Sequence, residues 1–339
     1  METPASRLQF FPIALFGSVM GVAGFSLALQ KATPVLGLPP ALSLAFTLLS
    51  AVFFMLMTSI YLVKSTRFPQ AVKKEFKNPV GAHFFGAFSI SILLISLLFQ
   101  DITPQAAQIL WFVGVILHFG LTLVLLNTWL LNNPWHLGEM TPAWFLPAVG
   151  NIIIPLGTPM FADLETGWFF FSTGLVMWLT LLIIVFYRIF FHPPMPKILE
   201  PFLFIFIAPP AMGFLAYVML NDGLVDNFAR ILYYIALFFA VFLITQTPRL
   251  IKLPFAISWW ALTFPLAAFA NASWVMYFSL YSPVYQGLAL LSMAMVLLLI
   301  GYLTFKTLQL VAQKKLCQPP VAPPPQDPID PAEQNQPSD

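Results

Sequence analysis

Side chains that could carry chemistry are scarce in the apolar parts of this 339-residue chain. His118 is the only ionisable residue that lies well inside an apolar stretch, and His83 lies near the start of another. A hydrolase needs a nucleophile with a base in reach, and a rhodopsin-like pigment needs a lysine in the middle of a helix. Neither pattern is present, and the lack of a carboxylate in these stretches disfavours a proton-driven carrier. We therefore expect no catalytic residue and no cofactor. We interpret His118 as a packed, hydrogen-bonded histidine, with a proton relay as the alternative role.

The polar groups that remain within the apolar stretches are hydroxyls, amides and backbone groups. The candidates are Ser18, Ser89, Ser91, Asn151, Thr263, Asn271 and Ser273. Such groups bind an ion loosely and let it leave quickly, as conduction requires. The sequence thus favours a weakly polar pathway over a reaction centre.

The most distinctive local motif is Trp259-Trp260-Ala261-Leu262-Thr263-Phe264-Pro265. A proline inside a helix removes one backbone hydrogen bond and kinks the helix. The bulky ring of Phe264, directly before Pro265, could therefore form an apolar constriction, which blocks ions by dewetting. Because the chain has 36 Phe residues, and most such rings pack or face lipid, the motif alone does not single out Phe264.

The elements that must position these residues are membrane-spanning helices. The chain is 59% hydrophobic and only 8% charged, against about 25% charged for a soluble domain. Since a span takes about 20 apolar residues, we predict an all-α integral membrane protein with ten transmembrane helices. The expected spans are residues 10–30, 40–63, 80–99, 106–131, 143–162, 167–190, 200–220, 227–246, 254–279 and 284–310.

Helix-breaking residues are concentrated in the odd-numbered spans, and the even-numbered spans have no internal proline. A freed backbone carbonyl is costly in lipid unless it is buried in protein or lines a wet cavity. We predict five helical hairpins, each pairing a broken helix with a regular one, with the odd helices as an inner ring around a pathway. Close helix packing is the alternative explanation for these residues. The pore-lining candidates are Gly17, Gly21, Gly86, Pro147, Gly150, Asn151, Pro209, Pro210, Thr263 and Pro265.

Charge indicates how the chain is oriented and divided. All of the 15 Lys and Arg residues except Lys31 and Arg230 fall on the side that holds both termini, which predicts cytoplasmic termini. The net charge of +2 is too small for a nucleic-acid partner. The single cysteine, Cys317, excludes an intrachain disulfide, and no Cys/His cluster has metal-ligand spacing. We expect a cytoplasmic N-terminus at 1–9, a channel domain at 10–312 and a disordered, Pro-rich cytoplasmic tail at 317–339.

From about residue 10 to 312 the chain resembles the tellurite-resistance and C4-dicarboxylate transporter family. That family includes bacterial tellurite-resistance channels, fungal malate permeases and the slow anion channels of plant guard cells. The resemblance rests on four stretches in order: Phe11-Pro12 with Phe16-Gly17 and Gly21, Phe145-Leu146-Pro147-Ala148-Val149-Gly150, Ala208-Pro209-Pro210 with Ala216-Tyr217, and the Trp259 to Pro265 motif.

The resemblance implies a pseudo-fivefold arrangement of five hairpins around a central pore, and commonly a homotrimer with one pore in each subunit. It implies that Phe264 is the pore-occluding phenylalanine and that Gly17 gives the ring space. It also implies small inorganic or organic anions as partners, besides the lipid bilayer. The architecture and the likeness together suggest a bacterial inner membrane. The long cytoplasmic extensions of the plant members are missing, so kinase gating is not expected.

Three hypotheses for function remain open. The first is an anion channel closed by the Phe264 ring, although anion preference does not follow from the residues, since freed carbonyls favour cations. The second is a C4-dicarboxylate transporter of the malate type, with or without proton coupling. No Lys or Arg lies in the middle of an odd-numbered span to meet a dianion. The third is a membrane scaffold or sensor without transport.

Overall fold

The computed structural model describes residues 7–131 and 134–318, and every regular element in those ranges is a helix. Ten helical segments are long and apolar enough to cross a membrane, as predicted. They are Ile13–Leu36, Pro40–Arg67, Pro79–Phe99, Pro104–Leu131, Pro142–Phe161, Leu164–Phe191, Lys197–Leu220, Asn227–Thr245, Ile257–Leu280 and Pro283–Ala312. Most of the Pro-rich tail at 317–339 lies outside the described residues.

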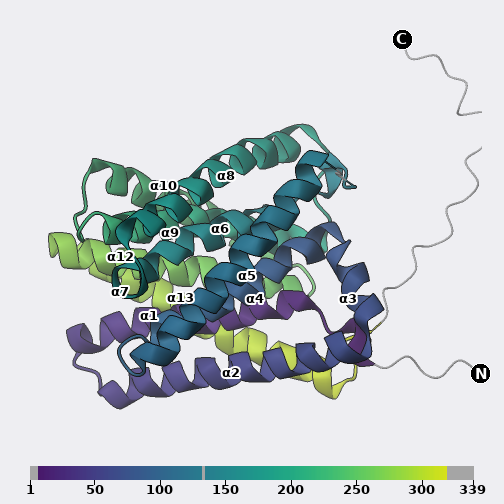
Figure 1. The fold of residues 1–339 in the computed structure, drawn as a ribbon, viewed down its shortest axis with the longest axis horizontal. Helices are drawn as coiled ribbons and strands as arrows, with labels where there is room; N and C mark the ends of the chain where they lie inside the picture. The colour runs from purple at the N-terminus through teal and green to yellow at the C-terminus, as the bar shows by residue number, and fades with distance from the viewer. Residues whose placement is uncertain (1–6, 132–133, 319–339) are drawn as a thin grey trace, which may run out of the picture.

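The even-numbered spans are five uninterrupted helices. They are α2 (Pro40–Arg67), α5 (Pro104–Leu131), α8 (Leu164–Phe191), α10 (Asn227–Thr245) and α13 (Pro283–Ala312). Figure 1 shows α2 running along the long axis of the molecule. Only 11 to 39% of the residues in their most apolar windows are buried, so these helices form an outer layer.

Four of the five odd-numbered spans are broken. Each begins as a 3-10 segment and continues as an α-helix: Ile13–Leu15 leads into α1 (Phe16–Leu36), Pro142–Phe145 into α6 (Leu146–Ile153), Lys197–Ile207 into α9 (Ala208–Leu220), and Ile257–Leu262 into α12 (Thr263–Leu280). The fifth span also contains a second 3-10 segment, Ile154–Gly157, and α7 (Thr158–Phe161). Proline drives the breaks after the first span, because it lacks the N–H that an α-helix needs and so favours the first helical turn.

The prediction of a broken third span is wrong. This span is the continuous helix α4 (Pro79–Phe99). Its only internal helix breakers are glycines such as Gly86, and a glycine keeps its N–H and its place in the hydrogen-bond ladder. Gly86 therefore leaves the helix intact where a proline would not.

The five odd-numbered spans form a closed inner ring. Helix α1 contacts α4, α4 contacts α6, α6 contacts α9, α9 contacts α12, and α12 returns to α1. In these spans 78 to 83% of the residues of the most apolar window are buried. Each inner helix also packs on its outer partner, α1 on α2, α4 on α5, α6 on α8, α9 on α10 and α12 on α13. The predicted inner ring of five hairpins is thereby confirmed.

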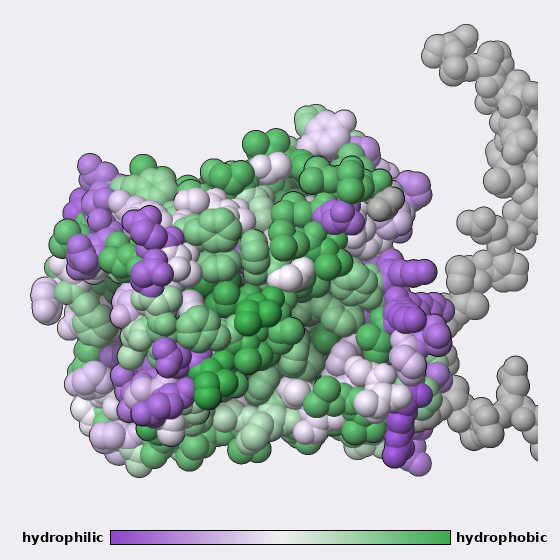
Figure 2. Space-filling model, viewed as in Figure 1, coloured by the Kyte–Doolittle hydropathy of each residue, from purple (hydrophilic) through white to green (hydrophobic). Residues whose placement is uncertain are grey.

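The surface has an apolar middle and a hydrophilic region toward each end of the long axis (Figure 2). We call one end the basic end, formed by residues 64–79, 134–141, 188–201, 249–257 and 306–318. We call the other the acidic end, formed by the connections at 37–39, 100–103, 162–163, 221–226 and 281–282. Each inner span begins at the basic end and finishes at the acidic end.

A buried ion pair fastens the first inner span at the basic end. The short helix α3 (Pro69–Phe76) carries Glu75, whose carboxylate accepts hydrogen bonds from Lys64, from the Tyr61 hydroxyl and from the Ile13 backbone N–H. Lys64 is only 2% exposed and also donates to the Phe11 carbonyl at 2.8 Å. We call these five residues the basic-end clamp. It ties α2 and α3 to the start of the first span.

Candidate functional site

Phe264 lies in the first turn of α12, one of the helices of the inner ring. Its side chain is buried, at 5% exposed, and among the described residues it makes no ring contact with another aromatic side chain. The ring lines two separate cavities, one toward each end of the molecule. It therefore lies between them without being held by aromatic stacking.

The cavity toward the acidic end has a volume of about 170 Å³. We call it the acidic-end vestibule. All five inner spans line it, which places it on the ring axis. Its lining residues are Gly24, Leu27, Lys31, Leu94, Leu97, Gln100, Leu156, Met212, Leu215, Val218, Met219, Gly223, Phe264, Ala268, Asn271 and Val275.

The cavity on the other side of the ring is much smaller, at about 20 Å³, which is about the space that one water needs. We call it the basic-end cavity, and all five inner spans line it as well. Its lining residues are Gly17, Met20, Phe84, Leu146, Val149, Ile205, Ala208, Trp260, Ala261, Phe264 and Pro265. Since none of these side chains is charged and Trp260 is the only one with a hydrogen-bonding group, the narrow part of the axis is apolar, and such a constriction resists ions by dewetting.

The glycine beside the Phe264 ring is Gly24, not Gly17. A Cβ added to Gly24 would lie 3.4 Å from the ring atom Cδ2, whereas a Cβ added to Gly17 would meet only Phe84, at 3.8 Å. The space for the ring that the resemblance attributed to Gly17 is thus supplied by Gly24 in this conformation. Gly17 lines the basic-end cavity together with Pro265.

Two further candidates pack α1 against α12. A Cβ on Gly21 would overlap the Thr263 side chain, so this position has room only for glycine. The Thr263 hydroxyl donates to the Trp260 carbonyl at 2.7 Å, which satisfies a backbone group of the 3-10 segment. Neither residue lines the vestibule or the basic-end cavity.

His118 is a packed, hydrogen-bonded histidine, as predicted. The side chain is fully buried, with Nδ1 2.8 Å from the Ser89 hydroxyl and Nε2 2.9 Å from the Pro147 carbonyl. Gly86 and Gly150 both face the imidazole, and a Cβ on Gly150 would overlap it. These two glycines make room for His118 between α4, α5 and α6.

The remaining candidates also serve the inner ring as structural residues. Asn151 donates to the Thr122 hydroxyl at 2.9 Å and to the Pro147 carbonyl at 2.8 Å. Pro147 lies in the first turn of α6, and Pro209 and Pro210 lie in the first turn of α9. None of the four lines either axial cavity. Of the predicted residues, the structure therefore places Gly17, Phe264 and Pro265 at the basic-end cavity and Asn271 at the acidic-end vestibule.

Lys31 is the functional candidate that the sequence did not single out. The first span runs beyond its predicted end at residue 30, so Lys31 lies within α1 and lines the vestibule. Its ammonium donates to the Asn271 side-chain oxygen at 3.0 Å. The spacing of Gly24, Leu27 and Lys31 places them on one face of a helix. A first span extended by one turn would therefore have predicted that Lys31 lines the pathway.

Two aspartates keep the acidic end negative. Asp163 accepts a hydrogen bond from the Thr166 backbone N–H at 2.8 Å, and Asp226 accepts one from the Ala229 N–H at 2.9 Å. These bonds hold the pKa of each carboxyl below its usual value. Both groups are therefore ionised at neutral pH, at the starts of the outer helices α8 and α10.

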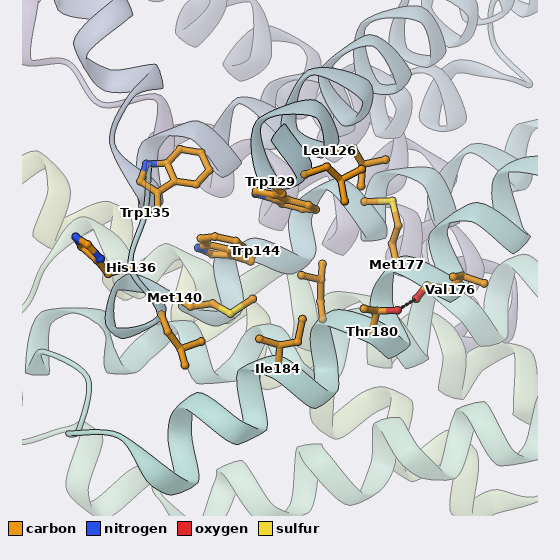
Figure 3. A pocket seen from close by; sticks show the side chains of 13 residues that line it. Leu126, Trp129, Trp135, His136, Met140, Trp144, Val176, Met177, Thr180 and Ile184 are labelled. Atoms are coloured by element: carbon orange, nitrogen blue, oxygen red, sulfur yellow. Dashed lines mark hydrogen bonds between the residues drawn. The ribbon is translucent and has the colours of Figure 1, made fainter. Parts of the chain in front are cut away.

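A third cavity, of about 480 Å³, opens between α5 and α8 near the basic end. Figure 3 shows Trp129 and Trp144 lying face to face at its wall, with ring centroids 5.4 Å apart. His83 stacks on Trp144 at 4.4 Å and is fully buried. This cavity shares no lining residue with the two axial cavities and lies among outer helices.

Comparison with known proteins gives consistent matches. A family model described as a voltage-dependent anion channel matches residues 10–308. An S-type anion channel of Arabidopsis thaliana is 28% identical over 270 residues, which cover 78% of this chain and 52% of that protein. An uncharacterized transporter of Methanocaldococcus jannaschii is 25% identical over 298 residues, covering 80% and 86%. A tellurite resistance protein TehA homolog of Haemophilus influenzae is 24% identical over 307 residues, covering 88% and 90%.

The extent of the matches differs between the relatives. The chain spans about half the length of two of the plant channels, at 52% and 42%. It covers most of the archaeal and bacterial relatives. The match therefore lies in the membrane part, and the family resemblance found in the sequence is confirmed.

Proposed function

Since the chain belongs to the voltage-dependent anion channel family, we propose that it is a channel for small anions whose pore is occluded by Phe264. One observation carries the proposal: the two cavities on the axis of the inner ring share the Phe264 ring as a common wall. The printed names of several relatives, which are S-type anion channels, supply the ion class. The family is one of channels and transporters, and no catalytic step is assigned to this chain.

Opening requires the ring to leave the axis. The surroundings of Phe264 favour such a movement, because Gly24 and Ala268 are small and no aromatic side chain of the described residues makes a ring contact with Phe264. Rotation of the side chain would join the vestibule to the basic-end cavity. That cavity is about the size of one water, so some separation of the inner helices must accompany the rotation.

The test is the current through purified protein in planar bilayers under a chloride gradient. We expect a small current for the parent and a current at least about tenfold larger for Phe264→Ala, which corresponds to a barrier lowered by about 1.4 kcal/mol. The reversal potential should follow the chloride gradient in both proteins.

Phe269→Ala is the matched control. Phe269 lies on the same helix, is also buried, and stacks on Tyr233 away from both axial cavities. Each variant loses a buried ring, at a cost of about 3 to 5 kcal/mol of stability, but only Phe264→Ala should conduct more. Equal currents from the two variants would contradict the occlusion of the pore by the Phe264 ring. Absence of current together with saturable malate uptake would favour the dicarboxylate transporter instead.

We further propose that the basic end faces the cytoplasm of a bacterial cell, with both termini on that side. The distribution of Lys and Arg supports this orientation. In a Cys317→Ser background, a membrane-impermeant maleimide should label Asp163→Cys but not Lys314→Cys on intact cells. The opposite pattern would reverse the orientation.

We also propose a homotrimer with one pore in each subunit, on the basis of the family. The apolar outer layer of α2, α5, α8, α10 and α13 supplies surface for contacts between subunits. The mass of the detergent-solubilised protein, measured by light scattering, tests the oligomeric state, and a monomeric mass would contradict the trimer.

A further inference from the structure

The acidic-end vestibule contains one charged side chain. Of the 16 residues that line it, Lys31 alone is ionisable, and Gln100 and Asn271 are the only polar side chains. The other walls are aliphatic side chains, glycines and the Phe264 ring. An ion that reaches Phe264 from the acidic end must therefore pass a single positive charge in mostly apolar surroundings.

No acidic side chain in the part of the chain that the structure describes forms an ion pair with Lys31. The described residues form two ion pairs, Lys64 with Glu75 and Arg249 with Glu200, and Lys31 belongs to neither. Its one hydrogen bond among them is to the neutral amide of Asn271. Since an ammonium has three N–H donors, two of them have no partner in the described part of the chain.

Two hydrogen bonds set the orientation of the Asn271 amide. Its Nδ2 donates to the Gly24 carbonyl and to the Ala267 carbonyl, each at 2.9 Å. The side-chain oxygen therefore points to the ammonium, and the amide ties that contact to the wall beside the Phe264 ring. Lys31 is thus held in the vestibule by a neutral group, which leaves its charge available to a ligand.

The acidic groups of this end lie outside the vestibule. Asp101 directly follows the lining residue Gln100, and Asp222 directly precedes the lining residue Gly223. Neither aspartate lines the cavity. Asp163 and Asp226 cap the outer helices α8 and α10. The entrance to the acidic-end vestibule is therefore negatively charged, whereas the one charged side chain that lines the vestibule, Lys31, is positive.

We propose that Lys31, held by Asn271, forms a binding site for a monovalent inorganic anion in the acidic-end vestibule and gives the pore its preference for anions over cations. This inference rests on the proposed function, because it assigns the selectivity of the same pathway. One ammonium compensates one negative charge. A dianion such as malate would bring a second charge into apolar walls, where an unpaired charge is unfavourable.

The experiment measures reversal potentials under a KCl gradient in the Phe264→Ala background, where current is expected to be large. Lys31→Gln removes the charge but keeps a donor for the Asn271 oxygen. We expect the permeability of chloride relative to potassium to fall about tenfold, the effect of one unit charge about 6 Å from an ion at a partly hydrated site. Lys31→Arg should stay within about twofold of the background.

Arg230→Gln is the matched control, because Arg230 is the other basic residue of the acidic end, is exposed on α10 and does not line the vestibule. Its permeability ratio should stay within about twofold of the background, since an exposed charge outside the pathway is screened. Asn271→Asp is a second test that keeps Lys31. It puts a carboxylate in place of an oxygen 3.0 Å from the ammonium, so it should lower the ratio as Lys31→Gln does.

The outcomes separate this inference from the proposed function. If Phe264→Ala conducts anions but Lys31→Gln and Asn271→Asp leave the permeability ratio unchanged, the inference is overturned and the channel stands. If Phe264→Ala carries no anion current, both are overturned. If malate carries as much current as chloride in the same background, the restriction to monovalent anions is wrong.

Discussion

Lys64 lies near the basic end of α2, and Lys31 lies near the acidic end of α1. The two lysines differ in whether their positive charge is paired. Lys64 is almost completely buried and faces the Glu75 carboxylate and the Phe11 carbonyl. Lys31 is half-buried, and its one hydrogen bond within residues 7–131 and 134–318 is to the Asn271 amide. The basic-end clamp neutralises its lysine, whereas the acidic-end vestibule leaves its lysine with an uncompensated charge.

The difference teaches what each region is for. A buried charge that is fully paired ties segments together, and removing one partner strands the other. A charge left without a counterion in a cavity is available to a mobile ion instead. The clamp is therefore expected to govern stability, and the vestibule is expected to govern which ions pass.

The largest effect is expected from Lys64→Met. This change leaves the Glu75 carboxylate without its cation, and Glu75 is only 16% exposed. We expect the free energy of unfolding to fall by about 3 kcal/mol, at the lower end of the range for a broken buried pair because Glu75 keeps some contact with water. Denaturant titration in detergent micelles measures the loss.

The double variant Lys64→Met/Glu75→Gln is the control for the clamp. It removes both charges, keeps one side-chain oxygen that can accept from the Ile13 N–H, and supplies an NH2 group that can donate to the Tyr61 hydroxyl oxygen. At least half of the lost stability should return. If Lys64→Met alters the chloride to potassium permeability ratio as strongly as Lys31→Gln does, the assignment of stability to the clamp and of ion selectivity to the vestibule is wrong.

The ten spans, the inner ring of helices and the candidate Phe264 could all be predicted from the sequence. Apolar length and proline position predicted ten spans and the inner ring, because lipid requires every backbone group to be satisfied within a helix or inside the protein. Phe264 was identified through the family motif and not through its own chemistry. The structure adds that this ring is the common wall of both axial cavities.

Other parts of the site depend on helix phase and length, which composition does not report. The distribution of helix breakers predicts an interruption at Gly86, but α4 continues through this residue. The same pattern makes Gly150 and Gly21 pore-lining candidates, and in the structure they make room for His118 and Thr263. The sequence places Lys31 in a connection, because it predicts an end of the first span at residue 30, six residues before Leu36.

A smaller effect is expected from glycine substitutions on the two sides of the Phe264 ring. In Gly24→Ala the new Cβ would lie 3.0 Å from the Ala267 Cβ and 3.4 Å from the ring, so neighbouring atoms must shift. We expect a loss of about 1 to 2 kcal/mol in stability and a smaller current in the Phe264→Ala background, because the vestibule becomes narrower. Single-channel recording and denaturant titration measure the two effects.

Gly17→Ala is the matched change in the basic-end cavity. Its Cβ would meet only Phe84, at an ordinary contact distance of 3.8 Å. Stability should change by less than about 0.5 kcal/mol, as for a substitution that breaks no packing. A larger loss for Gly17→Ala than for Gly24→Ala would show that the ring needs its space at Gly17, as the resemblance implied.

The smallest effect on the free energy of unfolding is expected from Lys31→Gln. Salt dependence provides a further test that distinguishes Lys31 from Lys64. Lys31→Gln gives up a charge that has no counterion among the described residues, so stability should change by less than about 0.5 kcal/mol. Its effect on permeability should shrink as ionic strength rises, because the Debye length falls from about 10 Å at 0.1 M to about 3 Å at 1 M. The stability lost in Lys64→Met should change little over that range, since a buried pair is poorly screened. Reversal potentials and unfolding curves recorded at both salt concentrations measure the contrast. If the Lys31 effect is as insensitive to salt as the Lys64 effect, Lys31 is not accessible to ions in the vestibule.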